Sequence, residues 1–464
     1  MKNKYTFLQP TYYKDFQCSG SNCNLNCCNY NWNITIDKDT YLKYRNVKEP
    51  KDFLEKLNKY VKRNRNSKGK LDYAKLVQID IKSTINFTNI EDDLEKKVQE
   101  DVFIKGCSFQ DENGLCEIHK NLGIDALSYT CKIFPRIFNN MFGNYERSLS
   151  LGCEEVSKLL YNAKDGVGFE LVEVDDTQIN LKNAYLIDLS KSKSPFLQYF
   201  DTARLICLNI LQLDELSIDN RMILLGAFMF KLDELVQNKN FDSIPTYMDT
   251  FLNNISAYEP LFNIKTVRQD NFLEIIVKSI LFISGKGGRA DTVFDLHNIM
   301  VKLKLAHSAN LQDRIISIKI DGEETLYENN EPIESPLVTL EDGSVISKVY
   351  TKYKENVERL MEGKEYYITN LLSHIFFSKS YPFDGTSIKD CYINFVWCYC
   401  YYKGLLAGYL GERETLDEDL LHRICTITGR TLVDQNQTLR KFLTNLKDNN
   451  LDNLPFLAVL IKSA

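Results

Sequence analysis

The sequence predicts a mainly α-helical protein in which a small, irregular α+β module rich in cysteine precedes a mostly helical domain. Eight of the thirteen cysteines fall within the first 153 residues. From Pro195 onward, apolar residues recur at the three- and four-residue spacing of amphipathic helices. A chain of 464 residues is also long enough for two or three domains. We therefore divide it into a cysteine-rich metal-binding module at 1–160, a polar connector at 161–195 and a helical domain at 196–464.

The cysteine module is predicted to contain short elements joined by turns. Alternating apolar and polar residues predict a strand at Asn33–Asp37, and amphipathic spacing predicts helices at Lys51–Arg63 and Glu91–Val102. A turn signal, Asp-Glu-Asn-Gly, separates Cys107 from Cys116. We expect that turn to bring the two thiols together, as the two arms of a hairpin.

The helical domain is predicted from six amphipathic stretches, with prolines in the gaps between them. The stretches are Phe196–Leu213, Met222–Val236, Phe272–Ile283, Thr292–Leu305, Val357–Phe377 and Asp390–Leu410. A less regular excursion at 314–350 carries strand-like pieces and two Asp-Gly turn signals, so we expect a small β insertion there. We find no internal repeat at a fixed period.

Composition and charge place the chain among ordinary globular proteins. It is 44% hydrophobic and 26% charged, and its formal net charge is −6, so the chain as a whole is not expected to bind nucleic acid. One local exception, Lys51–Lys70, holds eight lysines and arginines against two acidic residues. This segment is either a solvated helix end that runs into a loop or a docking patch for an acidic partner.

No targeting segment and no membrane span are expected. The start of the chain, Met1–Pro10, lacks the apolar core and the cleavage site of a signal peptide. The closest approach to a membrane span, Cys391–Tyr402, is too short and is bounded by Asp390 and Lys403. We therefore expect a cytoplasmic protein without a membrane partner, in which the thiols stay reduced and free to hold metal.

The eight N-terminal cysteines form runs with spacings suited to metal binding. They are Cys18, Cys23, Cys27, Cys28, Cys107, Cys116, Cys131 and Cys153. Thiolates are soft, anionic ligands, and four of them satisfy either a tetrahedral zinc ion or a cubane iron–sulfur cluster. We expect a subset of the eight to ligate, at one site with spare cysteines or at two sites. Adjacent side chains tend to point apart, so Cys27 and Cys28 need not reach the same metal.

Other residues and motifs limit which cysteines can bind metal and which classes of enzyme the chain can belong to. His119 lies three residues after Cys116 and is either a further ligand or a surface residue. The five later cysteines lie in apolar helical stretches and are expected in the core: Cys207, Cys391, Cys398, Cys400 and Cys425. The Cys-x3-Cys-x2-Cys motif of the commonest radical S-adenosylmethionine enzymes is absent, because the position it requires is Tyr30. The sequence also has no dinucleotide-binding glycine motif, no Walker loop and no Gly-x-Ser-x-Gly elbow.

Two blocks of sequence resemble a known family. The first runs from Pro10 to Cys18 and continues through Cys23, the Cys27-Cys28 pair and Trp32. The second block carries Gly106-Cys107-Ser-Phe, Gly114-Leu-Cys116-Glu-Ile-His, Leu122-Gly123, Leu127-Ser128, Thr130-Cys131, Phe134-Pro135-Arg136 and Ser148-Leu-Ser-Leu-Gly-Cys153-Glu154. The chain resembles the flagellin lysine-N-methylases, or FliB-like proteins, and over 10–155 the broader group of cysteine-rich zinc- or iron-chelating domains. It departs from that pattern at Gly152, where a proline is expected before the last cysteine.

The resemblance implies an enzyme that transfers a methyl group from S-adenosylmethionine to lysine ε-amines of flagellin, with a cysteine-bound 4Fe–4S cluster. Zinc is the alternative metal. Methyl transfer needs a neutral amine, so a carboxylate or phenolate must take the proton of the lysine. Candidates for that role are Glu365, Tyr366, Tyr367 and Tyr381. Arg136 is expected to bind the cofactor by neutralising a thiolate-rich cluster, to hold a substrate carboxylate, or to form a surface salt bridge.

Two other classes of function stay open on the sequence alone. In the first, the cysteines form a non-catalytic zinc- or iron–sulfur-binding module, and the helical domain binds a partner protein. In the second, the chain is a metal chaperone or redox carrier with a labile metal at an exposed site. The long helical domain favours a macromolecular substrate over a carrier role, and the cysteine blocks favour the methylase.

Overall fold

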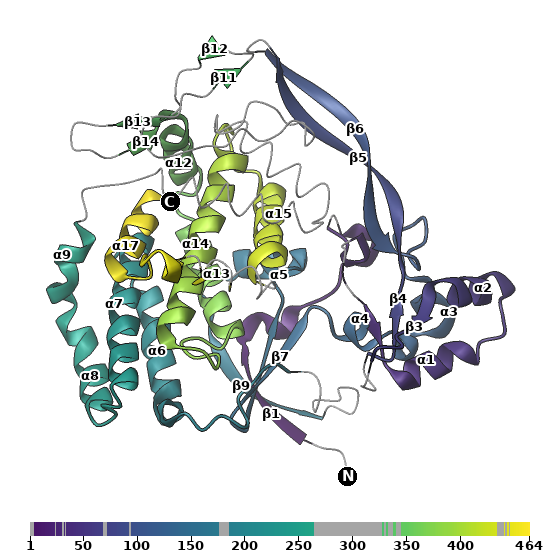
Figure 1. Ribbon diagram of the computed structural model, residues 1–464, viewed down its shortest axis with the longest axis horizontal. Coiled ribbons are helices and arrows are strands. Elements are labelled where there is room, and N and C mark those ends of the chain that lie inside the picture. The colour runs from purple at the N-terminus through teal and green to yellow at the C-terminus, as the bar shows by residue number, and fades with distance from the viewer. Residues whose placement is uncertain are drawn as a thin grey trace.

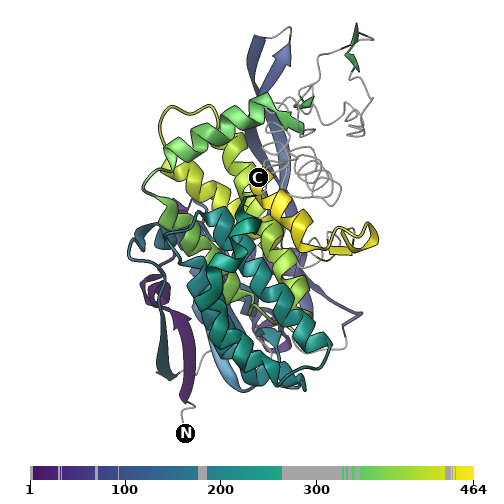
Figure 2. The same ribbon diagram turned by 90° about the vertical axis from the view of Figure 1, so that its left-hand side faces the viewer.

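A helical body, a five-stranded sheet and the cysteine module make up the fold (Figure 1). The computed structural model describes residues 4–23, 25–29, 32, 34–67, 72–91, 94–175, 185–263, 327–328, 331–332, 337–339, 345–433, 440, 443–444 and 446–464. The helices pack side by side into one body, and the N-terminal strand lies on its flank (Figure 2). The predicted mainly helical fold with a small β part is confirmed.

The helical body is built around α14 (Ile388–Leu410), which is buried along nearly its whole length. A helix that is apolar on all sides is stable only when its neighbours cover it, and α7, α12, α15 and α17 pack against it. The other helices are α6 (Phe200–Leu211), α7 (Ile218–Gln237), α8 (Ser243–Phe251), α9 (Glu259–Phe262), α12 (Lys348–Leu360), α13 (Glu365–Ser378), α15 (Glu418–Thr428) and α17 (Leu454–Ser463). Within the described residues, no helix combines the length and the apolar character that crossing a membrane requires.

Most of the predicted helices of this body are confirmed. Phe196–Leu213 corresponds to the 3-10 turn Pro195–Tyr199 followed by α6, Met222–Val236 to α7, and Asp390–Leu410 to α14. The single helix predicted at Val357–Phe377 is wrong, because α12 ends at Leu360 and α13 begins at Glu365. Between them, Gly363 adopts a φ of 71°, a left-handed conformation that a helix cannot continue through.

Part of the predicted helical domain lies outside the described residues. This applies to the helices expected at Phe272–Ile283 and Thr292–Leu305 and to much of the excursion at 314–350. Within that excursion, the structure describes two short antiparallel pairs, as predicted for a small β insertion. They are β11 (Tyr327–Glu328) with β12 (Glu331–Pro332), and β13 (Leu337–Thr339) with β14 (Val345–Ser347).

The five-stranded sheet has the order β10-β7-β8-β1-β9. Its strands are β1 (Lys4–Pro10), β7 (Arg136–Met141), β8 (Asn144–Leu149), β9 (Phe169–Asp175) and β10 (Tyr185–Asp188). The segment 161–195, expected as a polar connector, thus contributes both outer strands of this sheet. In β9, the alternation of apolar and charged residues is the pattern of a half-buried strand.

The cysteine module has its own small core. It contains α1 (Lys38–Arg45), α2 (Lys51–Tyr60), α3 (Glu117–Leu122), α4 (Tyr129–Ile133) and the sheet β2-β4-β3, with strands β2 (Thr35–Ile36), β3 (Val61–Arg63) and β4 (Ala74–Leu76). Ile36, Phe53 and Phe109 are among the side chains buried in this core. The predicted strand at Asn33–Asp37 and the helix at Lys51–Arg63 are therefore confirmed, each with shorter bounds.

The helix predicted at Glu91–Val102 is wrong. Of its described residues, Glu91 ends β5 (Gln78–Glu91) and residues 94–102 belong to β6 (Leu94–Cys107). The two strands pair antiparallel, from Gln78 opposite Cys107 to Glu91 opposite Leu94. The pair forms the ribbon that projects from the module in Figure 1. The β5 sequence largely alternates β-branched or aromatic residues with polar ones, which favours a strand. Pairing with β5 therefore outweighs the weak helical spacing of the β6 sequence.

The N-terminal segment joins the helical body through a buried hydrogen bond between Tyr12 and Nδ1 of His374. Burial lowers the pKa of His374 to about 3, only partly offset by a hydrogen bond at the Leu149 backbone. An unfolded histidine has a pKa near about 6.5, so below that pH the unfolded chain binds a proton that the folded chain does not. The folded state therefore loses up to about 1.4 kcal/mol per pH unit through this residue as the pH falls.

We expect His374→Gln to reduce this acid sensitivity, because glutamine keeps a polar partner for Tyr12 and cannot gain charge. The measurement is the free energy of unfolding in urea at pH 7 and pH 5 for both proteins. The loss between the two pH values should be smaller in the variant. An equal loss in both proteins would show that His374 does not titrate in this way.

Candidate metal centre

All eight N-terminal cysteines line one cavity of about 200 Å³. Its walls come from the cysteine module on one side and from the helical body on the other, and the remaining lining is largely apolar. In one wall, Trp32 and Phe134 pack edge to face with their ring centroids 4.4 Å apart. The structure therefore brings together every cysteine that the sequence singled out, from segments far apart in the chain.

The predicted hairpin brings Cys107 and Cys116 to the same side of this cavity. Gln110 forms a β-bridge with Cys116 and donates its backbone N–H to the Cys107 carbonyl at 3.2 Å. The carboxylate of Asp111 closes the turn by accepting hydrogen bonds from the backbone N–H groups of Asn113 and Leu115. An aspartate that caps its own turn is the local reason for this hairpin.

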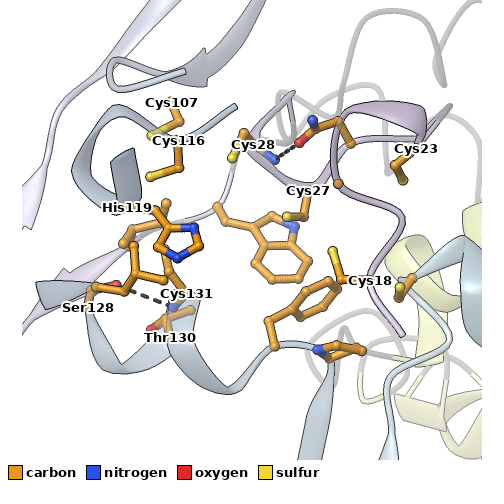
Figure 3. A pocket seen from close by; sticks show the side chains of 18 of the residues that line it. Cys18, Cys23, Cys27, Cys28, Cys107, Cys116, His119, Ser128, Thr130 and Cys131 are labelled. Atoms are coloured by element: carbon orange, nitrogen blue, oxygen red, sulfur yellow. Dashed lines mark hydrogen bonds between the residues drawn. The ribbon is translucent and has the colours of Figure 1, made fainter. Parts of the chain in front are cut away.

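The adjacent cysteines Cys27 and Cys28 reach different parts of the cavity. Figure 3 shows Cys28 on the side of Cys107 and Cys116, whereas Cys27 lies toward Cys18. Cys28 packs with the core of the cysteine module. The two side chains thus lie toward different neighbours, as expected, although their thiols still share a hydrogen bond.

Burial is the largest influence on the pKa of Cys23, Cys116, Cys131 and Cys153, whereas hydrogen bonds between thiols have the largest influence on Cys27, Cys28 and Cys107. Burial raises the pKa of Cys131 and of Cys153 to about 12. The pKa of Cys27 is lowered to about 7, because a hydrogen bond with Cys28 stabilises its thiolate and Arg430 lies nearby. Buried thiols with a raised pKa stay neutral unless a positive charge stabilises their thiolates. A metal ion bound in the cavity would supply that charge, and the thiols would lose their protons as it binds.

The donor chemistry of the cavity fits a thiophilic metal or an iron–sulfur cluster. Among the residues that the structure describes, no three His, Cys, Asp or Glu side chains already stand close enough together to hold one ion. The thiols must therefore turn toward a common centre when metal binds, which rotation about the Cα–Cβ bond permits.

Arg430 is a site residue that the sequence reasoning missed. It comes from the turn Gly429–Val433 that follows α15, and its side chain is only 4% exposed. Its Nε donates to the Gly152 carbonyl at 2.8 Å, and its Nη2 donates to the Leu25 carbonyl at 2.6 Å. Arg430 therefore ties two cysteine-bearing loops to the helical body at the edge of the cavity. Its position in the sequence, 278 residues beyond Gly152, gave no signal of this contact.

Gly429 allows this close approach. A Cβ atom at that position would lie 2.4 Å from the Leu151 carbonyl carbon and 2.6 Å from the Gly152 nitrogen, both of them backbone atoms. We therefore expect Gly429→Ala to cost about 1–3 kcal/mol of stability, because neither backbone can yield without moving the Cys153 loop.

The check on Gly429→Ala is urea unfolding, together with the metal content of the purified variant. The matched control is Gly168→Ala, where the added Cβ would meet only a Thr11 methyl group at 3.3 Å. Gly429→Ala should be the more destabilised of the two variants. Equal stability would contradict the tight contact between the helical body and the Leu151–Gly152 backbone.

Arg136 and His119 both lie at this site. The guanidinium of Arg136 stands 5.4 Å from the centre of the Phe16 ring, and Phe16 lines the cavity. His119 lines the cavity directly and is exposed. Their predicted roles, in cofactor binding for Arg136 and in ligation for His119, stay predictions.

The basic segment Lys51–Lys70 lies on α2, on β3 and in the loop that follows, and Lys68 and Lys70 lie outside the described residues. Lys56 forms an ion pair with Glu117 at 2.7 Å. The described lysines and arginines of the segment are otherwise mostly exposed, as a solvated surface requires.

The candidates for proton transfer in the helical body separate into one surface residue and three structural ones. Tyr367 and Tyr381 are buried, and the Tyr366 hydroxyl donates to the Tyr161 carbonyl at 3.0 Å. Glu365 is exposed and lines a second cavity of about 260 Å³. The structure thus leaves Glu365 as the accessible member of the set.

This second cavity gathers charged groups in an otherwise apolar pocket. Asp219 accepts hydrogen bonds from the Tyr399 hydroxyl at 2.6 Å and from the Lys403 ammonium at 3.1 Å. Burial, followed by repulsion from Lys403, lowers the pKa of Lys354 to about 8, with partial compensation from Asp219. The cavity therefore offers a carboxylate, a phenol and a weakly basic amine to a small ligand.

The fold and these residues define a helical protein with a thiol-lined centre, and comparison with known proteins gives its family. Residues 204–460 match the family model of the FliB lysine N-methylase C-terminal domain. Because this match covers more than half of the chain, the chain belongs to the FliB lysine N-methylase family, as the sequence blocks indicated.

The curated relatives cover a shorter part of the chain. It is 30% identical over 164 residues to the flagellar biosynthetic protein FliU of Salmonella muenchen, an alignment that covers 35% of this chain and 80% of that protein. It is equally similar to the lysine-N-methylases of Salmonella choleraesuis strain SC-B67 and Salmonella typhimurium strain LT2, over 35% of this chain and 34% of each of theirs. The chain thus matches about a third of the length of those two methylases. No solved structure matches the chain.

Proposed function

We propose that the protein is a lysine N-methyltransferase that transfers a methyl group from S-adenosylmethionine to lysine ε-amines of flagellin. The observation that carries the proposal is the match of residues 204–460 to the C-terminal domain of FliB lysine N-methylases. Two similar proteins are named lysine-N-methylases and a third is named a flagellar biosynthetic protein, which supports both the reaction and its flagellar context. The proposed place of action is the cytoplasm, where thiols stay reduced.

The reaction requires a neutral amine. The lone pair of the ε-amine forms a bond to the methyl carbon while the carbon–sulfur bond of the sulfonium breaks, and S-adenosylhomocysteine leaves. A lysine in water has a pKa of about 10.4, so its proton must first pass to a base or be lost on desolvation. Glu365, an exposed carboxylate at the second cavity, is the candidate acceptor of that proton.

The thiols of the first cavity would hold a 4Fe–4S cluster, with zinc as the alternative metal. When bound, a cluster with three protein ligands offers an open iron to the amino and carboxylate groups of the donor, and a fully ligated one supports the fold or passes electrons. Arg430 places a positive charge beside Cys27 and helps to neutralise the thiolates. Arg136, stacked on Phe16, is the candidate for a further contact to the bound cofactor.

The experiment that tests this function uses the full chain, purified without oxygen, together with flagellin and S-adenosylmethionine. The readout is the mass of intact flagellin, followed by peptide mapping of the modified lysines. We expect mass gains equal to whole methyl groups, confined to lysines and dependent on the donor. Metal-loaded, folded protein that binds flagellin without any mass gain would overturn the proposal in favour of a non-catalytic binding module.

A further inference from the structure

The eight thiols around the first cavity fall into two sets of four. The module set contains Cys28, Cys107, Cys116 and Cys131. The body set contains Cys18, Cys23, Cys27 and Cys153. The division rests on which core four of the cysteines pack against, on the hydrogen bonds that hold the cysteine loops, and on where the labelled side chains lie in Figure 3.

The module set is held by the small core of the cysteine module. Cys28, Cys107 and Cys116 all pack in that core. A Cβ atom on Gly106, the residue before Cys107, would lie 3.4 Å from the Cys28 carbonyl oxygen, so the two segments touch. Cys131 lies in the first turn of α4, which Ser128 caps, since the Ser128 hydroxyl accepts the Cys131 N–H at 3.3 Å. The helix that carries Cys131, α4, packs against β2 of the cysteine module.

The body set is held by the helical body. Cys153 packs against the large core of that body and directly precedes α5 (Glu154–Asn162). The loop between Cys23 and Cys27 is fastened to the same helix, because the backbone N–H of Leu25 donates to the Glu154 carboxylate at 3.2 Å.

Arg430 strengthens this attachment by binding the carbonyl of Leu25 and the carbonyl of Gly152, the residue before Cys153. The segments that carry Cys23, Cys27 and Cys153 are thus tied to the start of α5, and Figure 3 shows Cys18 beside Cys27.

The boundary between the sets runs through one peptide bond. Cys27 and Cys28 are adjacent in a 3-10 turn and share a hydrogen bond, and from there Cys27 lies toward Cys18 while Cys28 lies toward Cys107 and Cys116 (Figure 3). A single four-ligand centre would leave four thiols unused in the same cavity. Four thiolates on each side supply two complete ligand shells, each sufficient for a tetrahedral zinc ion or for a cubane cluster.

We propose that the eight cysteines form two separate four-thiolate metal sites, one within the cysteine module and one between that module and the helical body. The second site joins the module to the family domain, since Cys153 and Arg430 anchor it there. This inference rests on the metal-binding part of the proposed function and not on methyl transfer.

The first test uses the wild-type protein as purified, with the iron and zinc that it carries. A chelator removes the metal stepwise, an alkylating reagent labels each released thiol, and mass spectrometry of peptides locates the labels. We expect the cysteines of one set to be labelled together while all those of the other set stay protected. Release of all eight in one step, or of a mixture drawn from both sets, would overturn the proposal.

The second test uses paired substitutions, Cys107→Ser with Cys131→Ser for the module set and Cys23→Ser with Cys153→Ser for the body set. Each pair should lose the metal of its own site and keep that of the other, and the four substitutions together should lose all of it. Cys398→Ser, in the core of the helical body, is the matched control and should keep both metals. Loss of all metal from a folded paired variant, or full retention, would contradict two sites.

These outcomes separate the inference from the proposed function. Methyl transfer to flagellin by a protein whose eight thiols are released in one step would overturn the two sites and leave the methylase intact. A protein that releases its thiols as two sets of four but transfers no methyl group would support the two sites and contradict the methylase function.

Discussion

Replacing Cys23, Cys27 or Cys131 by alanine should lower the bound iron and the methylation of flagellin together. Each thiol lines the cavity, and each is one of only four in its set. Removing even a group that merely supports a metal ligand costs about 10–100-fold in metal affinity or activity, so the loss of a ligand should reach at least that range. The measurements are iron content per chain and the rate of mass gain on flagellin, made on the same preparation.

The control for this prediction is Cys398→Ala. Cys398 is a cysteine that the sequence assigned to the core, and it is 1% exposed within α14. Its replacement removes one buried sulfur and should cost about 1–2 kcal/mol of stability without loss of metal. Equal iron content and activity in all three cavity variants and in this control would show that the cavity thiols are not ligands.

Arg430→Met should loosen the contact between the helical body and the cysteine loops. The substitution keeps an apolar stem of similar length but leaves the carbonyls of Leu25 and Gly152 without the two hydrogen bonds that Arg430 donates. Hydrogen bonds from a charged group contribute about 1.5–3 kcal/mol each, so we expect the loss of both to lower the free energy of unfolding by about 3–6 kcal/mol. The pKa of the Cys27 thiol should also rise, because a nearby positive charge is removed.

The matched control for Arg430 is Arg413→Met, because Arg413 is exposed on the same body. Unfolding in urea and alkylation of Cys27 as a function of pH measure the two effects separately. Arg413→Met should change neither quantity appreciably. If Arg430→Met had the stability of wild type and an unchanged pH dependence of Cys27 alkylation, Arg430 would not hold the two cysteine loops to the helical body.

Local patterns predicted much of the fold. Helices such as α7 and α14 were found because their apolar residues repeat with a clear helical period. In the structure, each of the two begins at a serine N-cap. The helix expected at Glu91–Val102 failed because its strand partner, β5, lies on the other side of a hairpin, and local spacing does not weigh such pairing. The outer strands of the five-stranded sheet were missed for a similar reason, since their partners lie far away in the chain.

The candidate site shows the same division between local and distant information. Cysteine spacing identified all eight thiols that line the cavity, because close spacing places donors on one loop. It did not show which thiols belong together, since that depends on the two cores that hold them. Arg430 carried no local signal at all, because its contacts are with loops from the other end of the chain.

The most direct test of the central claim, that the cysteine-lined cavity is an iron–sulfur centre, is metal analysis of the full chain purified without oxygen. The measurement is iron, sulfide and zinc per chain, together with the visible spectrum. We predict at least about four irons with a matching amount of sulfide and a broad brown absorbance. Colourless protein that contains zinc and no iron would contradict the claim.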